Sequence, residues 1–187
     1  MAETDEAVRK FLDGEEEAFG CIVQRWEGKV YSLAWRMLGS REDAQDVVQE
    51  TFLSVFKAIR GLRDPGSFST WLYQIALNHC RARRRSRASG LHSGECAPNH
   101  ESILSNMPAV ERGAEELETL DIIRKAMEGL SEDHRTAIVF KEYLGLSLEE
   151  LASVMNCPLS TAKSRLYNGL KGVQRNLKRM GINLSKP

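Results

Sequence analysis

The chain has 187 residues, of which 42% are hydrophobic and 28% charged, so it can bury a core in one large or two small domains. No window approaches the ~18 apolar residues that span a bilayer, and the N-terminus has neither a basic leader nor an apolar stretch. We therefore expect a cytoplasmic protein without stable membrane insertion. The four cysteines are scattered without a C-x-x-C pair, which argues against a disulfide framework or a zinc knuckle.

The 26 acidic and 26 basic residues cancel in sum but are segregated along the chain. Residues 1–58 hold twelve acids and seven bases, whereas residues 59–92 hold one acid and seven arginines. Residues 93–121 hold seven acids and one base, and residues 122–187 hold six acids and eleven bases. Two separate basic blocks predict two contacts with a polyanion, with the acidic surfaces left for protein.

Helical periodicity dominates the first part of the chain, without a convincing alternating strand pattern. Apolar residues recur every three or four positions over about 15–38, with Asp13 as the expected N-cap. Ser40 is expected to cap a second helix that continues to about residue 59, because Asp43 follows three residues later. After a turn rich in proline and glycine, the spacing predicts a third long helix over about 68–87.

The end of the chain has the layout of a helix-turn-helix. Ser147 and Glu150 form a capping box before a short helix, and Asn156-Cys157-Pro158 makes a tight turn. Ser160 is expected to cap the next helix, which carries five basic residues and no acid through Lys178. Such units place the start of the second helix against base edges in the major groove, so the predicted ligand is double-stranded DNA.

These patterns predict an all-α protein of two small helical domains. Periodicity is lost over about 89–113, where glycine, proline and asparagine are frequent, and we expect a flexible linker there. The expected domains are 1–88 and 114–187, of which the second contains the helix-turn-helix. The recurrence of His92, Cys96 and His100 at a spacing of four is a weak metal pattern, and we predict no metal site or cofactor.

Two long segments carry a resemblance to a known family that covers nearly the whole chain. The first module contains SREDAQDVVQETFLSVFKAI (40–59) followed by GSFSTWLYQIALNHCRARRRS (66–86). The second contains LSEDHRTAIVFKEYLGLSLEELASVMNCPLSTAKSRLYNGLK (130–171). In this order, on either side of a weak linker, they resemble the extracytoplasmic-function (ECF) sigma factors, the minimal class of the sigma-70 family of bacterial transcription initiation factors.

The resemblance implies a role for each domain. It implies that domain 1–88 corresponds to sigma domain 2, which binds the polymerase clamp and the minus-ten promoter element. The polymerase-binding positions implied are Asp43, Asp46, Gln49, Glu50 and Phe52. For the minus-ten element we expect Trp71, Gln74, Asn78, Arg81, Arg83, Arg84 and Arg85, of which the arginines suit backbone contacts.

Domain 114–187 is implied to correspond to sigma domain 4, which binds the minus-thirty-five element. The positions expected to contact this DNA are Ser160, Thr161, Lys163, Ser164, Arg165, Asn168, Lys171 and Arg175. The chain departs from the family's usual pattern at Tyr167-Asn168-Gly169, where a second arginine pair is common. Gly169 is also expected to weaken its helix by up to ~1 kcal/mol relative to alanine.

The predicted function is that of a sigma factor, without a catalytic site of its own, that directs core RNA polymerase to specific promoters and helps open the DNA. The family also implies an anti-sigma partner. A helix-turn-helix regulator that acts without polymerase is the alternative, since the C-terminal motif alone fits it. Several residues also have simpler roles open to them. The acids of 43–50 could form a solvated face, whereas Phe52 and Trp71 fit a core as well as a contact.

Overall fold

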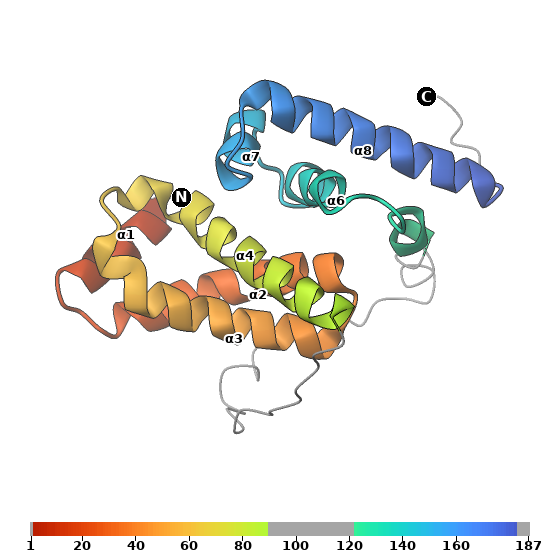
Figure 1. Ribbon diagram of the computed structural model, residues 1–187. Helices are drawn as coiled ribbons and strands as arrows, with labels where there is room; N and C mark the ends of the chain where they lie inside the picture. The colour runs from red at the N-terminus through yellow and green to blue at the C-terminus, as the bar shows by residue number, and fades with distance from the viewer. Residues whose placement is uncertain (1, 90–121, 183–187) are drawn as a thin grey trace.

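The computed structural model describes residues 2–89 and 122–182, and every regular element in these segments is a helix (Figure 1). The first module, residues 2–89, contains α1 (Ala2–Leu12), α2 (Ala18–Leu38), α3 (Arg41–Ala58), α4 (Phe68–Ala88) and short 3-10 turns at Ile59–Gly61 and Pro65–Ser67. The second module, residues 122–182, contains α6 (Glu132–Ile138), the π-helical turn η3 (Val139–Tyr143), α7 (Leu148–Val154) and α8 (Leu159–Arg179). The all-α prediction is confirmed. Most of the expected linker, residues 90–113, lies outside the described residues.

The core of the first module lies where α2, α3 and α4 pack together. Each helix buries a stripe of apolar residues that recur every three or four positions. Trp26 of α2 joins the stripes, because its ring packs edge-on against Phe68 and Tyr73 of α4 at centroid distances of 6.0 and 5.6 Å. This core fixes α4 relative to α3, and these two helices carry the residues expected to bind polymerase and the minus-ten element.

The predicted cap between α2 and α3 is confirmed. Gly39 ends α2 in the left-handed conformation, with φ of 72°, and its N–H donates to the carbonyl of Trp35. Ser40 follows in an extended conformation, and its hydroxyl oxygen accepts a hydrogen bond from the backbone N–H of Asp43 at 3.3 Å. The chain therefore turns sharply here and lays α3 against α2.

The start of the chain differs from the sequence-based expectation. Residues 2–12 form α1, which the periodicity argument did not predict, and its Val8 and Phe11 are buried against the first-module core. Asp13 does not cap α2, because its backbone N–H is bonded to the carbonyl of Arg9 at the end of α1. The helix α2 begins at Ala18, after a turn that includes Gly14 at φ 104°.

The helix-turn-helix of the second module forms as predicted, with one change of boundary. The capping box is present, since Ser147 Oγ accepts from the Glu150 N–H at 3.0 Å and Glu150 Oε2 accepts from the Ser147 N–H at 2.7 Å. Ser160, however, does not cap α8. The helix starts at Leu159, and the carbonyl of Pro158 accepts the N–H groups of Thr161 and Ala162. Ser160 lies exposed in the first turn.

Gly169 has a packing role that the sequence did not reveal. It is buried where α8 crosses α6, and a Cβ there would lie 3.0 Å from the carbonyl oxygen of His134 and 3.0 Å from Cδ1 of Ile138. The absence of a side chain lets the two helices approach closely. Its low helix propensity is therefore offset by the packing of α8 on α6.

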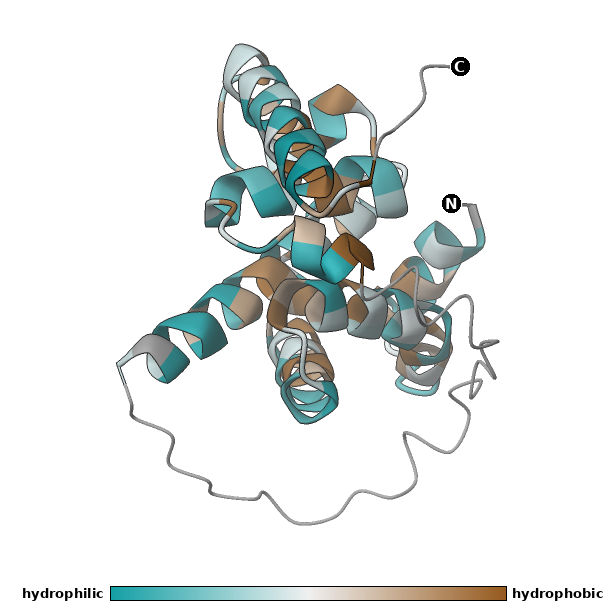
Figure 2. Ribbon diagram, turned by 90° about the vertical axis from the view of Figure 1, so that its right-hand side faces the viewer, coloured by the Kyte–Doolittle hydropathy of each residue, from teal (hydrophilic) through white to brown (hydrophobic). Residues whose placement is uncertain are grey.

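The two modules pack against each other rather than standing apart (Figure 1). Tyr73 of α4 packs edge-on against Phe140 of η3 at 5.4 Å, and Arg36 of α2 lies over the Tyr143 ring at 4.2 Å. Hydrophobic segments of both modules gather where they meet (Figure 2). In both views α3 and α8 lie on opposite sides of the molecule.

Candidate polymerase and promoter surfaces

The acidic residues of α3 face the arginines of α4. Arg83 Nη2 lies 3.0 Å from both Asp46 Oδ2 and Glu50 Oε1. Asp43 was expected on an exposed face with these acids, and this expectation is wrong: its side chain is buried and pairs with Arg87. Part of the predicted polymerase face and part of the predicted DNA face thus neutralise each other across the α3–α4 contact.

Glu50 is tied further into this network. Its Oε2 lies 3.1 Å from His79 Nδ1, and the other ring nitrogen of His79 is 3.0 Å from Ser54 Oγ. Phe52 is buried, with 7% of its surface exposed, so it supports α3 from within the core as the sequence allowed. Of the predicted polymerase positions, Asp46, Gln49 and part of Glu50 remain accessible.

Two apolar residues of α3 were missed by the sequence argument. Leu53 and Phe56 expose 53% and 48% of their surfaces. Their spacing from Gln49, four and seven residues, places the three side chains on one helical face. Phe56 also contacts the rings of Phe11 and Phe19, at 5.8 and 5.0 Å, which fixes its orientation. The signal was available for Leu53, which falls outside the buried period of α3, whereas Phe56 belongs to the apolar series of the helix and lies at its edge.

Of the seven expected minus-ten residues of α4, Arg83 pairs with acids of α3 and Arg84 is half-buried, and the other five divide into two groups. Gln74 and Arg81 are engaged by the second module: Gln74 Nε2 donates to the Ser153 carbonyl at 2.8 Å, and Arg81 pairs with two acids of α6. Asn78 and Arg85 are exposed, and Trp71 is half-buried beside Phe68 at 6.1 Å. The face predicted to hold DNA is therefore partly covered in this arrangement.

Arginines at the junction of the modules are not all satisfied. Within the described residues, Arg84 Nη1 and Arg135 Nε are buried without a hydrogen-bond partner. Arg135 Nη2 does donate to the Met127 carbonyl at 3.0 Å. Burial and the neighbouring charge of Arg84 lower the pKa of Arg135. The contact between modules thus includes like charges as well as favourable pairs.

Two neutral titratable groups lie in the same region. Burial, with a smaller contribution from Glu150, raises the pKa of Tyr73 to about 12. Burial also raises the pKa of the Cys80 thiol to about 12, with Glu132 adding to the effect. Both side chains remain uncharged at neutral pH, so they serve packing rather than chemistry.

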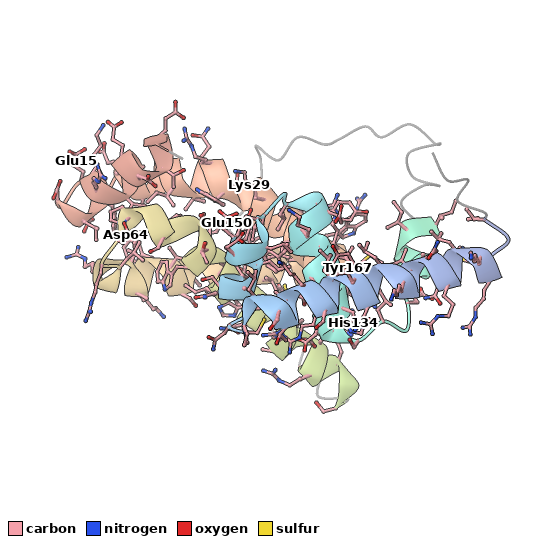
Figure 3. The ribbon with its side chains drawn as sticks, turned by 90° about the horizontal axis from the view of Figure 1, so that it is seen from above. Glu15, Lys29, Asp64, His134, Glu150 and Tyr167 are labelled. Atoms are coloured by element: carbon pink, nitrogen blue, oxygen red, sulfur yellow. The ribbon has the colours of Figure 1, made fainter. Side chains whose placement is uncertain are left out.

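The helix α8 presents an exposed basic face on the outside of the second module. Tyr167, which exposes 62% of its surface, marks this outward side (Figure 3). Ala162, Leu166 and Leu177 point inward and are buried. The exposed predicted DNA positions are Ser160, Lys163, Ser164, Asn168, Lys171 and Arg175, whereas Thr161 is half-buried. The spacing of apolar residues in the sequence of α8 therefore predicts its buried and exposed faces correctly.

A hollow of about 470 Å³ lies between α8 and the start of α6. Lys171, Arg175 and Arg179 line it, together with His134, against one carboxylate, Glu128. Cations clustered along one groove suit a phosphate backbone. Arg165 differs from these residues, because it turns inward and its Nη2 lies 2.7 Å from Asp133 Oδ2.

The sequence matches two family descriptions, one in each module. Residues 22–90 match Sigma-70 region 2, and residues 120–171 match Sigma-70, region 4. Within the described residues, no helix is both long and apolar enough to cross a membrane.

Curated relatives match over most of their length. The RNA polymerase sigma-H factor of Pseudomonas aeruginosa is 32% identical, covering 91% of this chain and 91% of that protein. The ECF RNA polymerase sigma-E factor of Haemophilus influenzae is 34% identical, covering 95% and 98%. The sigma-E factor of Escherichia coli K12 is 35% identical, covering 89% and 90%. The chain belongs to the ECF sigma factors of the sigma-70 family, and its function is that of an RNA polymerase sigma factor.

Solved structures show the same fold. CnrH, solved in complex with the cytosolic domain of CnrY, superposes with a TM-score of 0.71 at 24% identity, covering 95% of this chain and 98% of that one. RpoE of Bartonella quintana, solved with the anti-sigma factor NepR, gives 0.64 at 23% identity, covering 86% and 96%. The arrangement of helices is thus shared with CnrH and with the sigma factor RpoE, each at less than 25% sequence identity.

Proposed function

We propose that this sigma factor uses three separate surfaces: the outer face of α3 for core polymerase, the exposed flank of α4 for the minus-ten element, and α8 for the minus-thirty-five element. The observation that carries the proposal is the placement of an apolar face on α3 and an acid-free basic face on α8, on opposite sides of one chain (Figure 1). A chain with both faces can hold a protein and DNA at once.

The polymerase surface consists of Asp46, Gln49, Leu53 and Phe56. The two apolar side chains provide area that is removed from water on binding, each about 1.5–3 kcal/mol when fully buried. Asp46 at the rim favours a basic partner and orients the encounter more than it adds affinity. Leu53 and Phe56 extend the set predicted from the sequence, whereas Asp43 and Phe52 act inside the fold.

The minus-ten surface centres on Trp71, Asn78 and Arg85. A base that leaves the duplex loses stacking worth a few kcal/mol, and an aromatic ring beside an amide can replace it. Trp71 is half-buried next to Phe68, and Asn78 is exposed on the same helix. Arg85 contacts the DNA backbone. Gln74 and Arg81 become part of this surface when the second module moves away from α4.

The minus-thirty-five surface is the outer face of α8. Lys163 and Ser164 lie in the first two turns, where base edges in the major groove are reached. Lys171 and Arg175 line the basic hollow beside α6 and contact phosphates. Ser160, Thr161 and Asn168 complete the contact, and Arg165 joins it once it is released from Asp133. Tethering both DNA surfaces in one chain raises the effective concentration of the second contact once the first has formed.

An anti-sigma protein is the expected inhibitor, and the exposed apolar residues on α3 and α8 give it a place to bind. Leu53, Phe56 and Tyr167 each expose about half of their surface or more. The solved RpoE structure contains the anti-sigma factor NepR, and CnrH was solved with the cytosolic domain of a second protein, CnrY. We include an anti-sigma protein in the proposal on this basis.

The test compares DNA binding with and without core polymerase. The chain should form a stable complex with core, and the complex should bind a promoter fragment far more tightly than the chain alone does. A regulator that acts without polymerase gives the opposite pattern: tight operator binding by the chain alone and no complex with core. That result would reject the proposed function.

A further inference from the structure

One carboxylate, that of Asp133, holds two arginines from different modules. Its Oδ1 lies 3.3 Å from Arg81 Nη2 of α4, and its Oδ2 lies 2.7 Å from Arg165 Nη2 of α8. The neighbouring Glu132 places Oε1 2.8 Å from Arg81 Nε. All of these side chains are partly shielded from water, so the pairs are screened less than those on an open surface.

Both arginines belong to DNA surfaces in the proposed function. Arg81 lies on the minus-ten helix and Arg165 near the start of the recognition helix. A guanidinium offers the same planar donors to a carboxylate as to a phosphate. Donors that are held by Asp133 cannot contact DNA at the same time.

We propose that Asp133 is an autoinhibitory residue that stands in for DNA phosphate, holding the modules closed and withholding Arg81 and Arg165 from the promoter. This inference rests on the proposed function, because it takes both arginines as DNA contacts. When DNA or polymerase draws the modules apart, the two arginines exchange a carboxylate of their own chain for phosphate.

The remainder of the contact between modules is consistent with a closed state that can open. Gln74 bonded to Ser153, and Tyr73 packed on Phe140, favour closure. Arg84 and Arg135 oppose it, because each keeps a buried N–H group without a hydrogen-bond partner within the described residues. Opening exposes these N–H groups to water, which favours the open form. The ion pairs of Asp133 stabilise the closed form against this effect.

Opening of the modules couples the two DNA surfaces. DNA that engages either arginine favours the open form, in which neither arginine is held by Asp133. The coupling is reciprocal, since two ligands that favour the same open state favour each other's binding. Engagement of either promoter element therefore promotes engagement of the other.

The experiment uses the full chain and compares Asp133→Asn with Glu142→Gln. Each variant removes one negative charge from the second module, but Glu142 is exposed on η3 and has no ion pair among the described residues. A mixed-sequence duplex labelled with a fluorophore serves as the DNA probe, and small-angle X-ray scattering gives the radius of gyration of the free chain. We expect D133N to bind the duplex several-fold more tightly than E142Q does and to have a larger radius of gyration.

A second variant guards against misfolding of the first. Glu132→Gln loosens Arg81 but leaves Arg165 on Asp133, so it should give an intermediate increase in both measurements, with circular dichroism unchanged. The proposal is overturned if the Asp133 and Glu132 variants match Glu142→Gln in either DNA affinity or radius. Promoter-directed transcription by core polymerase with the wild-type chain is measured separately. If the wild-type chain does not support it, the proposed function is rejected, whatever the result for Asp133.

Discussion

The side-chain amide of Gln74 donates a hydrogen bond of 2.8 Å to the backbone carbonyl of Ser153, which joins α4 of the first module to α7 of the second. The sequence assigns Gln74 to the minus-ten surface and Ser153 to the helix-turn-helix, two surfaces that bind separate promoter elements in the proposed function. In this structure they bind each other. The described conformation is therefore a closed form of the chain, in which part of the predicted DNA-binding surface is engaged by the other module.

Replacing Leu53 by serine should weaken binding to core polymerase without destabilising the fold. Leu53 exposes 53% of its surface, so its removal leaves no cavity. Loss of most of its apolar contact with a partner corresponds to about 1.5–2 kcal/mol, or more than about tenfold in the dissociation constant. Met180→Ser, at an exposed apolar residue directly after α8, is the control. Equal affinities for the two variants, measured by fluorescence anisotropy, would remove α3 from the interface.

Gly169→Ala should lower the free energy of unfolding. The added methyl meets the His134 carbonyl oxygen at 3.0 Å, and overpacking of this kind costs about 1–3 kcal/mol, which exceeds the ~1 kcal/mol that alanine gains in helix propensity. Gly28→Ala, in a helix with open space around it, should instead stabilise by about 0.5–1 kcal/mol. Urea unfolding measures both, and a stabilised Gly169 variant would show that α6 yields to the methyl group.

Lys163 and Lys178 should differ in what they contribute to DNA binding. Lys163→Ala removes a side chain from the start of the recognition helix and should reduce discrimination between promoter and mutated promoter by about 1–3 kcal/mol. Lys178→Ala, near the end of α8, should weaken binding to both DNAs equally. It should also reduce the slope of the logarithm of the binding constant against the logarithm of salt concentration by about 1, which corresponds to one released counterion. Binding titrations of the polymerase complex at several salt concentrations test this. Equal loss of discrimination in both variants would contradict the assignment of base reading to Lys163.

Tyr73 should make the fold sensitive to high pH. Because burial raises its pKa from 10 to about 12, the folded state disfavours the phenolate, and stability that is full below pH 10 is lost as the pH rises toward 12. At about pH 11 the loss from this group is about 1 kcal/mol. Tyr73→Phe should lack that part of the decline, whereas Tyr167→Phe, at an exposed site, should decline as wild type does.

Urea unfolding at about pH 9 and pH 11 separates these cases. An identical decline in wild type and Tyr73→Phe would mean that the phenol is not desolvated in the folded protein, and hence that Phe140 does not cover it in solution.

Local features of the fold could be read from the sequence because they depend on neighbouring residues. The caps at Ser40 and Ser147, the long helix α4 and the inward face of α8 all follow from short-range spacing. Where two neighbouring residues can each begin a helix, spacing alone does not decide between them, and the predicted cap at Ser160 was wrong. Pro158 takes the N-cap position of α8, two residues before Ser160, the serine that was expected to cap it.

The relations between distant residues could not be read in the same way. Asp43 has the spacing of an exposed acid, yet Arg87, far along the chain, draws it into a buried pair. The helix α1 has too few apolar residues to stand out, and it is stabilised by the cover that Val8 and Phe11 provide to the core. The contacts of Gln74 and Asp133 depend on how the modules dock, which no local pattern encodes.

Mapping of transcription start sites on the genomic DNA of the source organism, with purified chain and core polymerase, tests the central claim most directly. We expect start sites that core polymerase alone does not use, preceded by two shared sequence elements at a constant spacing, and we expect them to be lost with Leu53→Ser and retained with Met180→Ser. The same start sites from core polymerase alone would contradict the assignment of this chain as the promoter-specificity subunit.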